Sequence, residues 1–173
     1  MLARRPANRV NGPMDIDILI EAPEWDAVDL EALAQAACDA TLRDLSLVSD
    51  GWELSLLACD DARIATLNAD FRAKPTPTNV LSWPSEDLAP ATPGAMPDHS
   101  DLSEEVGDLA LAYQTCAREA ADGGKPLEHH VTHLIVHGLL HCLGFDHETD
   151  ADADLMETTE TRILARLGVP DPY

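Results

Sequence analysis

Apolar and polar residues alternate near the start of the chain, with the period of two that is typical of a β-strand. In the segment MDIDILIE, residues 14–21, the apolar side chains of Ile16, Ile18 and Ile20 fall on one face. Three further short apolar segments predict strands at residues 52–59, 78–84 and 106–113. Pro84 ends the third of the four strands, because proline lacks the N–H group that a ladder hydrogen bond needs.

Between these strands the apolar positions recur at helical spacing, as in helices with one buried face. The first such segment is residues 26–45, with Asp26 as the expected N-cap. Four more helices are predicted at residues 60–73, 114–124, 126–142 and 150–168. Gly123 and Gly124 stop the third of the five helices, and Pro126 opens the fourth. Interleaved strands and helices predict a small sheet covered by helices.

Two segments fall outside this pattern. Residues 1–13, MLARRPANRVNGP, are basic and lack the apolar stretch of a secretory signal, so we expect a disordered tail. Residues 84–105 are rich in Pro, Ser and Asp, which predicts a long mobile loop. Residues 14–173 are then expected to form a single domain, which suits a chain of 173 residues.

The composition restricts the class of protein. The net charge is -21, from 32 acidic and 11 basic residues, and such a surface repels polyanions. This is an objection to any nucleic-acid substrate. No run of about 18 apolar residues occurs, so no membrane span is expected. The four cysteines are scattered without a C-x-x-C pair, which favours reduced thiols in a cytoplasmic protein.

The segment HGLLHCLGFDH, residues 137–147, carries a candidate metal site. His137 and His141 are four residues apart, so on a helix their side chains project side by side. Gly144 can take the left-handed conformation that reverses the chain, which lets His147 return to the same ion. Three imidazoles suit zinc and leave a fourth position for water, the pattern of a catalytic site. Nickel, copper or cobalt would also be accepted.

Neighbouring residues allow more than one interpretation. His133, one turn earlier, either supports the metal ligands or is a polar residue that lines the site or the core. Asp146 either orients an imidazole or caps the turn. His129 and His130 are expected at the surface. Gly138 stands where a zinc protease carries the glutamate that takes a proton from water.

Three motifs carry a resemblance to known families. HGLLHCLGFDH resembles H-E-x-x-H-x-x-G-x-x-H of the metzincin proteases, and it is more similar to the signature of the YbeY family of bacterial rRNA-maturation endoribonucleases. LNADFRAKPTPTNVLSWP, residues 67–84, resembles that family's second motif, and GDLALA, residues 107–112, resembles its strand motif. Two positions depart from the second motif, because Asn79 replaces an aspartate and Trp83 replaces a phenylalanine.

The resemblance to the YbeY family implies an α+β, zincin-like fold with a small mixed four-stranded sheet covered by helices. It implies one zinc ion on His137, His141 and His147, and a catalytic role for Arg72. It also implies single-strand-specific cleavage of RNA, in maturation of the small-subunit rRNA 3′ end and in ribosome quality control. The implied partners are single-stranded RNA, the small ribosomal subunit and one of its proteins, and neither DNA nor a membrane is expected.

The residues themselves are compatible with three classes of function. Phosphodiester cleavage needs charge neutralisation on the phosphate, which a metal and Arg72 can supply. Arg63 and Lys74 lie nearby in sequence and could extend a basic patch. A second class is another metal-dependent hydrolase, such as a peptidase with its base at Asp146 or Glu148. A third class is a non-catalytic ribosome-assembly factor in which zinc only holds the fold. Without the resemblance, the simplest interpretation of Arg72 is a helix-end cation.

Overall fold

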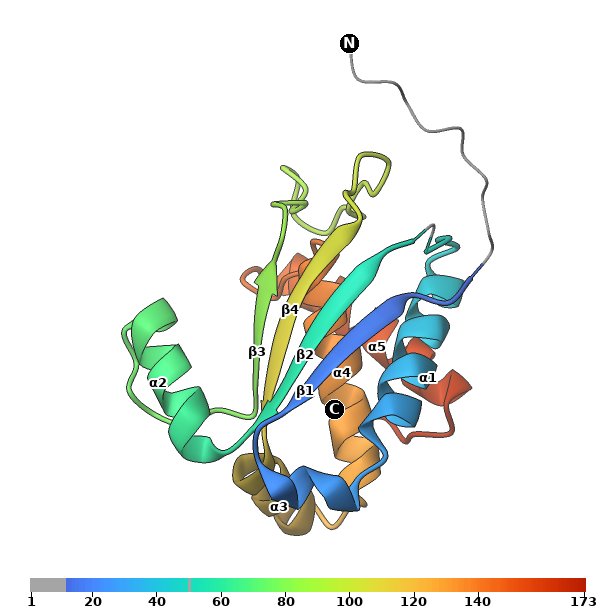
Figure 1. Ribbon diagram of the computed structural model, residues 1–173. Coiled ribbons are helices and arrows are strands. Elements are labelled where there is room, and N and C mark those ends of the chain that lie inside the picture. The colour runs from blue at the N-terminus through green and yellow to red at the C-terminus, as the bar shows by residue number, and fades with distance from the viewer. Residues whose placement is uncertain (1–11, 50) are drawn as a thin grey trace.

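The computed structural model describes residues 12–49 and 51–173, whose arrangement is shown in Figure 1. In chain order the elements are β1 (Asp15–Ile20), the 3-10 helix η1 (Pro23–Ala27), α1 (Leu30–Asp44), β2 (Glu53–Cys59), α2 (Asp61–Arg72), β3 (Val80–Pro84), β4 (Glu105–Ala112), α3 (Tyr113–Asp122), α4 (Leu127–Cys142) and α5 (Asp150–Arg166). The predicted strands and α-helices all appear, with shifts at their ends. The expected basic tail at residues 1–13 lies outside the described residues, except for Gly12 and Pro13.

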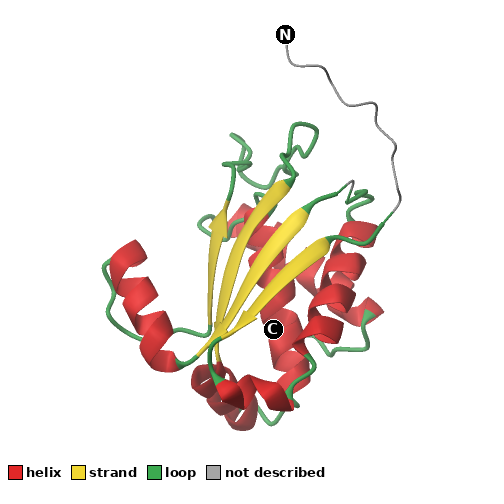
Figure 2. Ribbon diagram, in the orientation of Figure 1, coloured by secondary structure: helices red, strands yellow, loops and turns green. Residues whose placement is uncertain are grey.

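The four strands form one sheet in the order β1-β2-β4-β3 (Figure 2). β1 and β2 run parallel, as do β2 and β4, whereas β3 is antiparallel to β4. The expected α+β fold with a mixed four-stranded sheet is therefore confirmed. Parallel neighbours need a crossover connection, and α1 and α2 lie within the two connections. β3 is left as an edge strand.

Helices cover one face of the sheet, and this face holds the main core (Figure 1). α4 packs on β3 and β4, α1 packs on β1, and α5 packs against α4 and α1. The largest fully buried side chains of this core include Trp25, Leu54, Leu56, Leu109, Ile135, Leu139 and Leu140. α2 lies on the other face over a smaller cluster, which consists of Cys59, Ile64, Leu81, Ala110 and Ala112. α4 is thus the helix between the sheet and the outer helix α5.

The predicted N-cap at Asp26 is wrong. Residues Pro23–Ala27 form η1, and α1 starts later, with Asp29 as the N-cap whose side chain accepts a hydrogen bond from the Ala32 N–H. The reason is tertiary, because Trp25 is fully buried and its indole N–H donates to the Cys59 carbonyl at 2.9 Å. Placing Trp25 in the core fixes a separate turn before the helix.

The segment between β3 and β4, residues 85–104, contains no helix or strand and lies against the ends of α4 and α5. Nε2 of His99 donates to the Leu143 carbonyl at 2.7 Å, and the Gly94 N–H donates to Asp152 Oδ1 at 2.8 Å. These contacts tie the segment to the turn that follows α4. Its mobility stays a prediction.

The cysteines agree with the expectation of reduced thiols. All four cysteines are buried and free of disulfides. Burial raises the pKa of each thiol to about 12, so the thiols stay protonated near neutral pH.

Within residues 12–49 and 51–173, every helix is too short or too polar to cross a membrane.

Gly144 shapes the turn after α4. Its φ is +94°, in the region that side-chain-bearing residues rarely adopt, and an added Cβ would lie 2.6 Å from the Leu88 carbonyl oxygen. Gly168, after α5, has a φ of +71° but no heavy atom within 4 Å of the Cβ position. Alanine substitutions at the two glycines therefore distinguish the free-energy cost of a side chain at positive φ from the cost of a close contact with Leu88.

We predict that Gly144→Ala lowers the free energy of unfolding more than Gly168→Ala does. Both variants carry the conformational cost of a side chain at positive φ, about 1–2 kcal/mol. Only Gly144→Ala also overlaps the backbone of residue Leu88, which adds about 1–3 kcal/mol. Urea unfolding monitored by circular dichroism measures the difference. Equal losses for the two variants would contradict the close packing of the 85–104 segment on this turn.

Candidate metal centre

The end of α4 and the turn after it bring three histidines together. His137 and His141 occupy successive turns of α4, with ring centroids 4.6 Å apart. The chain reverses at Gly144, and the His147 ring then lies 5.6 Å from that of His137 and 5.0 Å from that of His141. Each ring offers one nitrogen, and these nitrogens lie within 4.8 Å of one another. The structure thus gathers the three side chains that the sequence selected.

Hydrogen bonds fix the tautomers of two of these rings. His137 Nδ1 is hydrogen-bonded to the Glu160 carboxylate, and His141 Nδ1 lies 3.1 Å from the Phe145 carbonyl oxygen. Both partners only accept, so each Nδ1 carries the proton and each Nε2 presents a lone pair. The two Nε2 atoms face each other at 3.1 Å. Two lone pairs cannot hydrogen-bond to each other, so this arrangement favours a cation that both nitrogens can bind.

The protonation of His141 agrees with this arrangement. Burial is the main cause that lowers the pKa of His141 to about 4, and the neighbouring rings of His137 and His147 act in the same direction. The imidazole is therefore neutral near pH 7, which is the form that binds a metal. Zinc sits about 2.0–2.1 Å from imidazole nitrogens, which is compatible with the observed separation. The donor set fits a divalent ion such as zinc.

The carboxylate that holds His137 was not identified from the sequence. Glu160, on α5, has no exposed surface. Besides His137, its carboxylate accepts a hydrogen bond from the Tyr173 hydroxyl and lies 3.6 Å from Nε2 of His133. Burial raises the pKa of Glu160, but His133, His137 and Tyr173 together outweigh this effect and bring the pKa to about 2. Glu160 is therefore ionised at neutral pH.

A signal for Glu160 exists in the sequence. It occupies the buried stripe of α5, whose other members are Met156, Thr159, Ile163 and Leu164. An acidic residue in such a stripe needs a hydrogen-bonding partner in the core. The pattern could have drawn attention to Glu160, but it could not name His137 as its partner.

His133 and Asp146 can now be placed. His133 lies beside Glu160, in a second cluster with Glu160 and His137. The facing atoms of His137 and Glu160 already satisfy each other, so this cluster is better described as support for His137 than as another metal site. Asp146 Oδ1 accepts from the His147 N–H at 2.7 Å, which favours the turn-capping interpretation.

A cleft of about 640 Å³ opens in front of the three histidines. Its walls come from the end of α2, from β3, from the start of the 85–104 segment and from the turn after α4. Arg72 is the one lysine or arginine among the lining residues. Arg63 instead pairs with Glu21 at 3.2 Å, and Lys74 does not line the cleft. The basic patch that the sequence allowed is therefore reduced to Arg72 at this site.

The acidic residues of the cleft outnumber its arginine. The lining carboxylates are those of Glu86, Asp87, Asp146 and Glu148. Arg72 is exposed and makes no hydrogen bond or ion pair with the part of the chain that the structure describes. Its guanidinium is thus available to an anion, while the surrounding carboxylates oppose a second phosphate.

Gly138, at the position where a zinc protease carries a glutamate, packs closely against the sheet. Gly138 is buried on α4, and a Cβ there would lie 2.7 Å from Cδ2 of Leu109, on β4. Leu109 is itself in the core, so a larger residue at position 138 has no free space. A glutamate at this position would therefore require the Leu109 side chain to shift.

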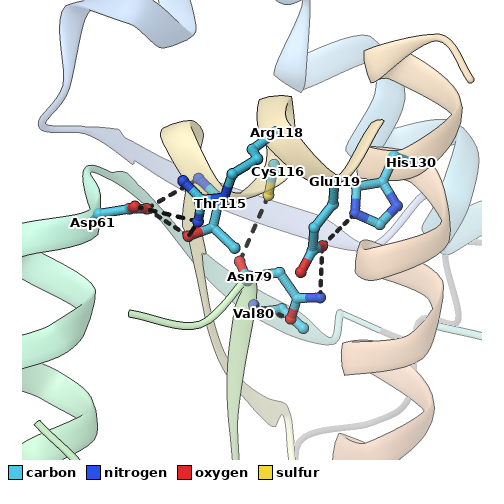
Figure 3. Close-up of polar contacts among 8 residues, drawn as sticks. All are labelled: Asp61, Asn79, Val80, Thr115, Cys116, Arg118, Glu119 and His130. Carbon is cyan, nitrogen blue, oxygen red and sulfur yellow. Dashed lines mark hydrogen bonds and ion pairs between the residues drawn. The ribbon is translucent and has the colours of Figure 1, made fainter. Parts of the chain in front are cut away.

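A polar network behind the cleft explains the departure at Asn79 (Figure 3). The side-chain amide of Asn79 donates to Glu119 Oε2 at 3.0 Å, while its Oδ1 accepts from the Val80 N–H at 2.7 Å. The same Glu119 oxygen lies 2.7 Å from Nε2 of His130. The prediction that His130 lies at the surface is therefore wrong, because this contact holds the ring in the core.

The network also ties α2 to α3. Asp61, at the start of α2, accepts hydrogen bonds from the backbone N–H and the hydroxyl of Thr115 at 3.0 and 2.7 Å. Arg118 lies 3.8 Å from the same carboxylate. Because α2 ends at Arg72 and Asn79 precedes β3, these contacts help to position two walls of the cleft.

Comparison with known proteins places the cleft in a family context. The sequence model of the family described as Endoribonuclease YbeY matches residues 16–168. A protein named Endoribonuclease YbeY from Jannaschia sp. (strain CCS1) is 79% identical over 160 residues, which are 92% of this chain and 100% of that relative. The protein of the same name from Dinoroseobacter shibae is 64% identical over 162 residues, 91% of this chain and 90% of the relative. The matched span includes every lining residue of the cleft.

A solved structure has a similar fold. The solution structure of TM1509 from Thermotoga maritima superimposes with a TM-score of 0.53 at 17% sequence identity. The similarity covers 88% of this chain and 91% of that one. At this identity the likeness concerns the fold alone.

We predict that Glu160→Gln weakens metal binding by about 10- to 100-fold, as is typical when a partner of a metal-binding imidazole is altered. Glutamine keeps a similar shape but removes the charge that fixes and strengthens His137. Competition with a chromophoric chelator gives the affinity for Zn²⁺ or Co²⁺. Glu128→Gln, at an exposed position on α4, is the matched control. Unchanged affinity in a folded Glu160→Gln protein would argue against this role.

Asn79→Asp is expected to lower the free energy of unfolding at neutral pH by about 1 kcal/mol. The substitution removes the amide donor and places a carboxylate against Glu119. The effect is modest because 40% of the Glu119 side chain is exposed. Chemical unfolding of the single variant, of Glu119→Gln and of the double variant gives the coupling. Strict additivity of the two changes would show that the side chains do not interact.

Proposed function

The chain belongs to the endoribonuclease YbeY family, and from this premise we propose that it is a metal-dependent endoribonuclease acting on single-stranded RNA. In this proposal His137, His141 and His147 hold one zinc ion, and Arg72 is the catalytic arginine. The biological role is maturation of the small-subunit rRNA 3′ end and ribosome quality control in the cytoplasm. The partners are the small ribosomal subunit and one of its proteins.

The histidine geometry supports the metal. The Nε2 lone pairs of His137 and His141 converge, and Glu160 and the Phe145 carbonyl hold the two rings in the required tautomer. When bound, the ion supplies Lewis-acid chemistry at the scissile phosphodiester. The task of the surrounding chain is to keep both imidazoles neutral and oriented before substrate arrives.

Arg72 supports phosphodiester chemistry. Its planar guanidinium presents donors in a fork that matches two phosphate oxygens. Negative charge grows on the non-bridging oxygens during cleavage, and a positioned cation stabilises that charge. Arg72 lines the same cleft as the three histidines, so it can reach a phosphate held in front of them.

One observation carries the proposal. Two Nε2 lone pairs face each other at 3.1 Å in a cleft whose one lining lysine or arginine is Arg72, within a chain of the YbeY family. Gly138 supplies no base at the position where zinc proteases carry a glutamate, and Asp146 and Glu148 line the cleft, so the peptidase alternative is decided by assaying peptide and RNA with the same protein.

The acidic cleft walls set the mode of RNA binding. Affinity for RNA normally depends on many Lys and Arg contacts, and each contact makes binding more sensitive to salt. With one arginine against four carboxylates, the cleft suits a single bound phosphate rather than a long polyanion. We therefore expect weak binding to free RNA and assistance from a ribosomal partner. A duplex, with its dense charge, is disfavoured more strongly than a single strand.

We predict that Arg72→Ala lowers kcat/KM for an unstructured RNA oligonucleotide by at least about 100-fold, because a charge-stabilising donor is lost. Zinc content should stay at the wild-type level, because Arg72 is not part of the histidine set. Gel analysis of the cleaved RNA and elemental metal analysis of the same preparations measure the two quantities.

Arg43→Ala is the matched control for this experiment. Arg43 is also an arginine in the last turn of a helix, α1, but it lies outside the cleft. His141→Ala should lose both zinc and RNA cleavage. An unstructured peptide, incubated with the same zinc-loaded protein, should remain intact. Retained cleavage by Arg72→Ala would remove the arginine role, and peptide cleavage without RNA cleavage would replace the nuclease by a peptidase.

A further inference from the structure

An aromatic pair, formed by exposed Phe71 and partly buried Trp83, lies next to the candidate active site. Phe71, in the last turn of α2, is 54% exposed, although aromatic residues make up only 4% of the chain. Its ring packs edge-on against Trp83, on β3, with centroids 5.4 Å apart and planes at 66°. Trp83 in turn packs against the small cluster under α2. The Phe71 ring thus packs on Trp83 and also presents a solvent-exposed surface.

The pair adjoins the cleft through two chain neighbours. Phe71 directly precedes Arg72, which lines the cleft. Trp83 lies between Ser82 and Pro84, which also line the cleft. Side chains alternate along a strand, so Trp83 faces the α2 side of the sheet and its neighbours face the histidines. The cleft and the aromatic pair therefore occupy the two sides of the same strand.

The position of β3 makes both sides reachable by one substrate. β3 is an edge strand, so a flexible chain can pass around it from the cleft to Phe71 without crossing another strand. Figure 1 shows α2 beside β3, and its buried Ile64 packs on the face of the sheet opposite α4. A nucleic-acid strand whose phosphate lies at Arg72 can thus extend its next base towards Phe71.

We propose that Phe71, supported by Trp83, is a stacking site for one unpaired nucleobase adjacent to the phosphate bound at Arg72. Aromatic side chains beside a cation are the usual platform for single-stranded nucleic acid, because every base has a flat face that can stack. This inference rests on the proposed function and specifies the substrate of that site. A base inside a duplex is already stacked and paired, so the site selects single strands.

The stacking site also compensates for the acidic cleft. Stacking on Phe71 is independent of charge, so it adds affinity where carboxylates limit the number of phosphate contacts. It gives little sequence preference, because all four bases can stack. The departure from the family motif at Trp83 fits this role, since the larger indole offers Phe71 a broader support than a phenyl ring.

The first test is kinetic. Phe71→Ala should lower kcat/KM for a short unstructured RNA by about 5- to 100-fold, the range expected for loss of one stacked base. Phe71→Tyr should retain most of the activity, because it keeps the aromatic face. Leu19→Ala is the control, because Leu19 is 60% exposed and lies on β1, the opposite edge strand. Zinc content of each variant should match the wild type, and urea unfolding checks that each variant is folded under the assay conditions.

The second test locates the base. A series of RNA oligonucleotides carries a single abasic nucleotide at successive positions around the cleavage point. With the wild type, one abasic position next to the cleaved phosphate should reduce cleavage as much as Phe71→Ala does. With Phe71→Ala, the same abasic position should cause no further loss, because the stacking contact is already absent.

The outcomes separate this inference from the proposed function. If the wild type cleaves RNA but Phe71→Ala cleaves it equally well, the stacking site is refuted while the nuclease stands. The stacking site is likewise refuted if the abasic and Phe71→Ala losses multiply at every position. If the wild type does not cleave RNA at all, the proposed function fails and the inference fails with it.

Discussion

The hydrogen bond between His137 Nδ1 and the buried carboxylate of Glu160 is the interaction on which the candidate site depends. A charge without solvent contact is costly unless hydrogen bonds satisfy it. Here His137 and Tyr173 donate to the carboxylate, and His133 lies beside it, so α4, α5 and the C-terminal residue meet at one group. The same contact decides which nitrogen of His137 faces the cleft. The contact that stabilises the packing of α5 on α4 therefore also orients His137, a candidate metal ligand.

The sheet supplies the other walls by leaving β3 at its edge. The antiparallel β3 lies beside β4, over α4, and its side chains reach the cleft on one face and α2 on the other. Asn79 fixes the start of this strand through Glu119 and His130, and Asp61 joins α2 to α3. Arg72, on α2, and the histidines of α4 thus approach the cleft from opposite sides of β3. The polar contacts of Asn79 and of Asp61 hold β3 and α2 in place.

Charge explains how an acidic protein can act on a polyanion. A net charge of -21 repels RNA from most of the surface, and the cleft itself is rich in carboxylates. In the function that we propose, a metal ion, Arg72 and one base stacked on Phe71 would together attract a single strand locally, without requiring a basic surface. Such a site would bind RNA weakly by itself, which is why the proposed function includes a ribosomal partner. In this proposal, selection of unpaired RNA would follow from the same shortage of positive charge.

Local spacing determined much of this protein. The strand patterns, the helix spacing and the His137, His141, Gly144 and His147 series depend on residues near one another in sequence, so their geometry could be predicted. Assignment of Arg72 needed the family resemblance, because a helix-end arginine has no local signature of catalysis. Tertiary structure decided the contacts between distant segments: Glu160 with His137, Gly138 with Leu109, Phe71 with Trp83, and Trp25 with Cys59. These depend on how helices seat on the sheet, and a linear pattern of apolar residues fixes which face is buried but not which partner it meets.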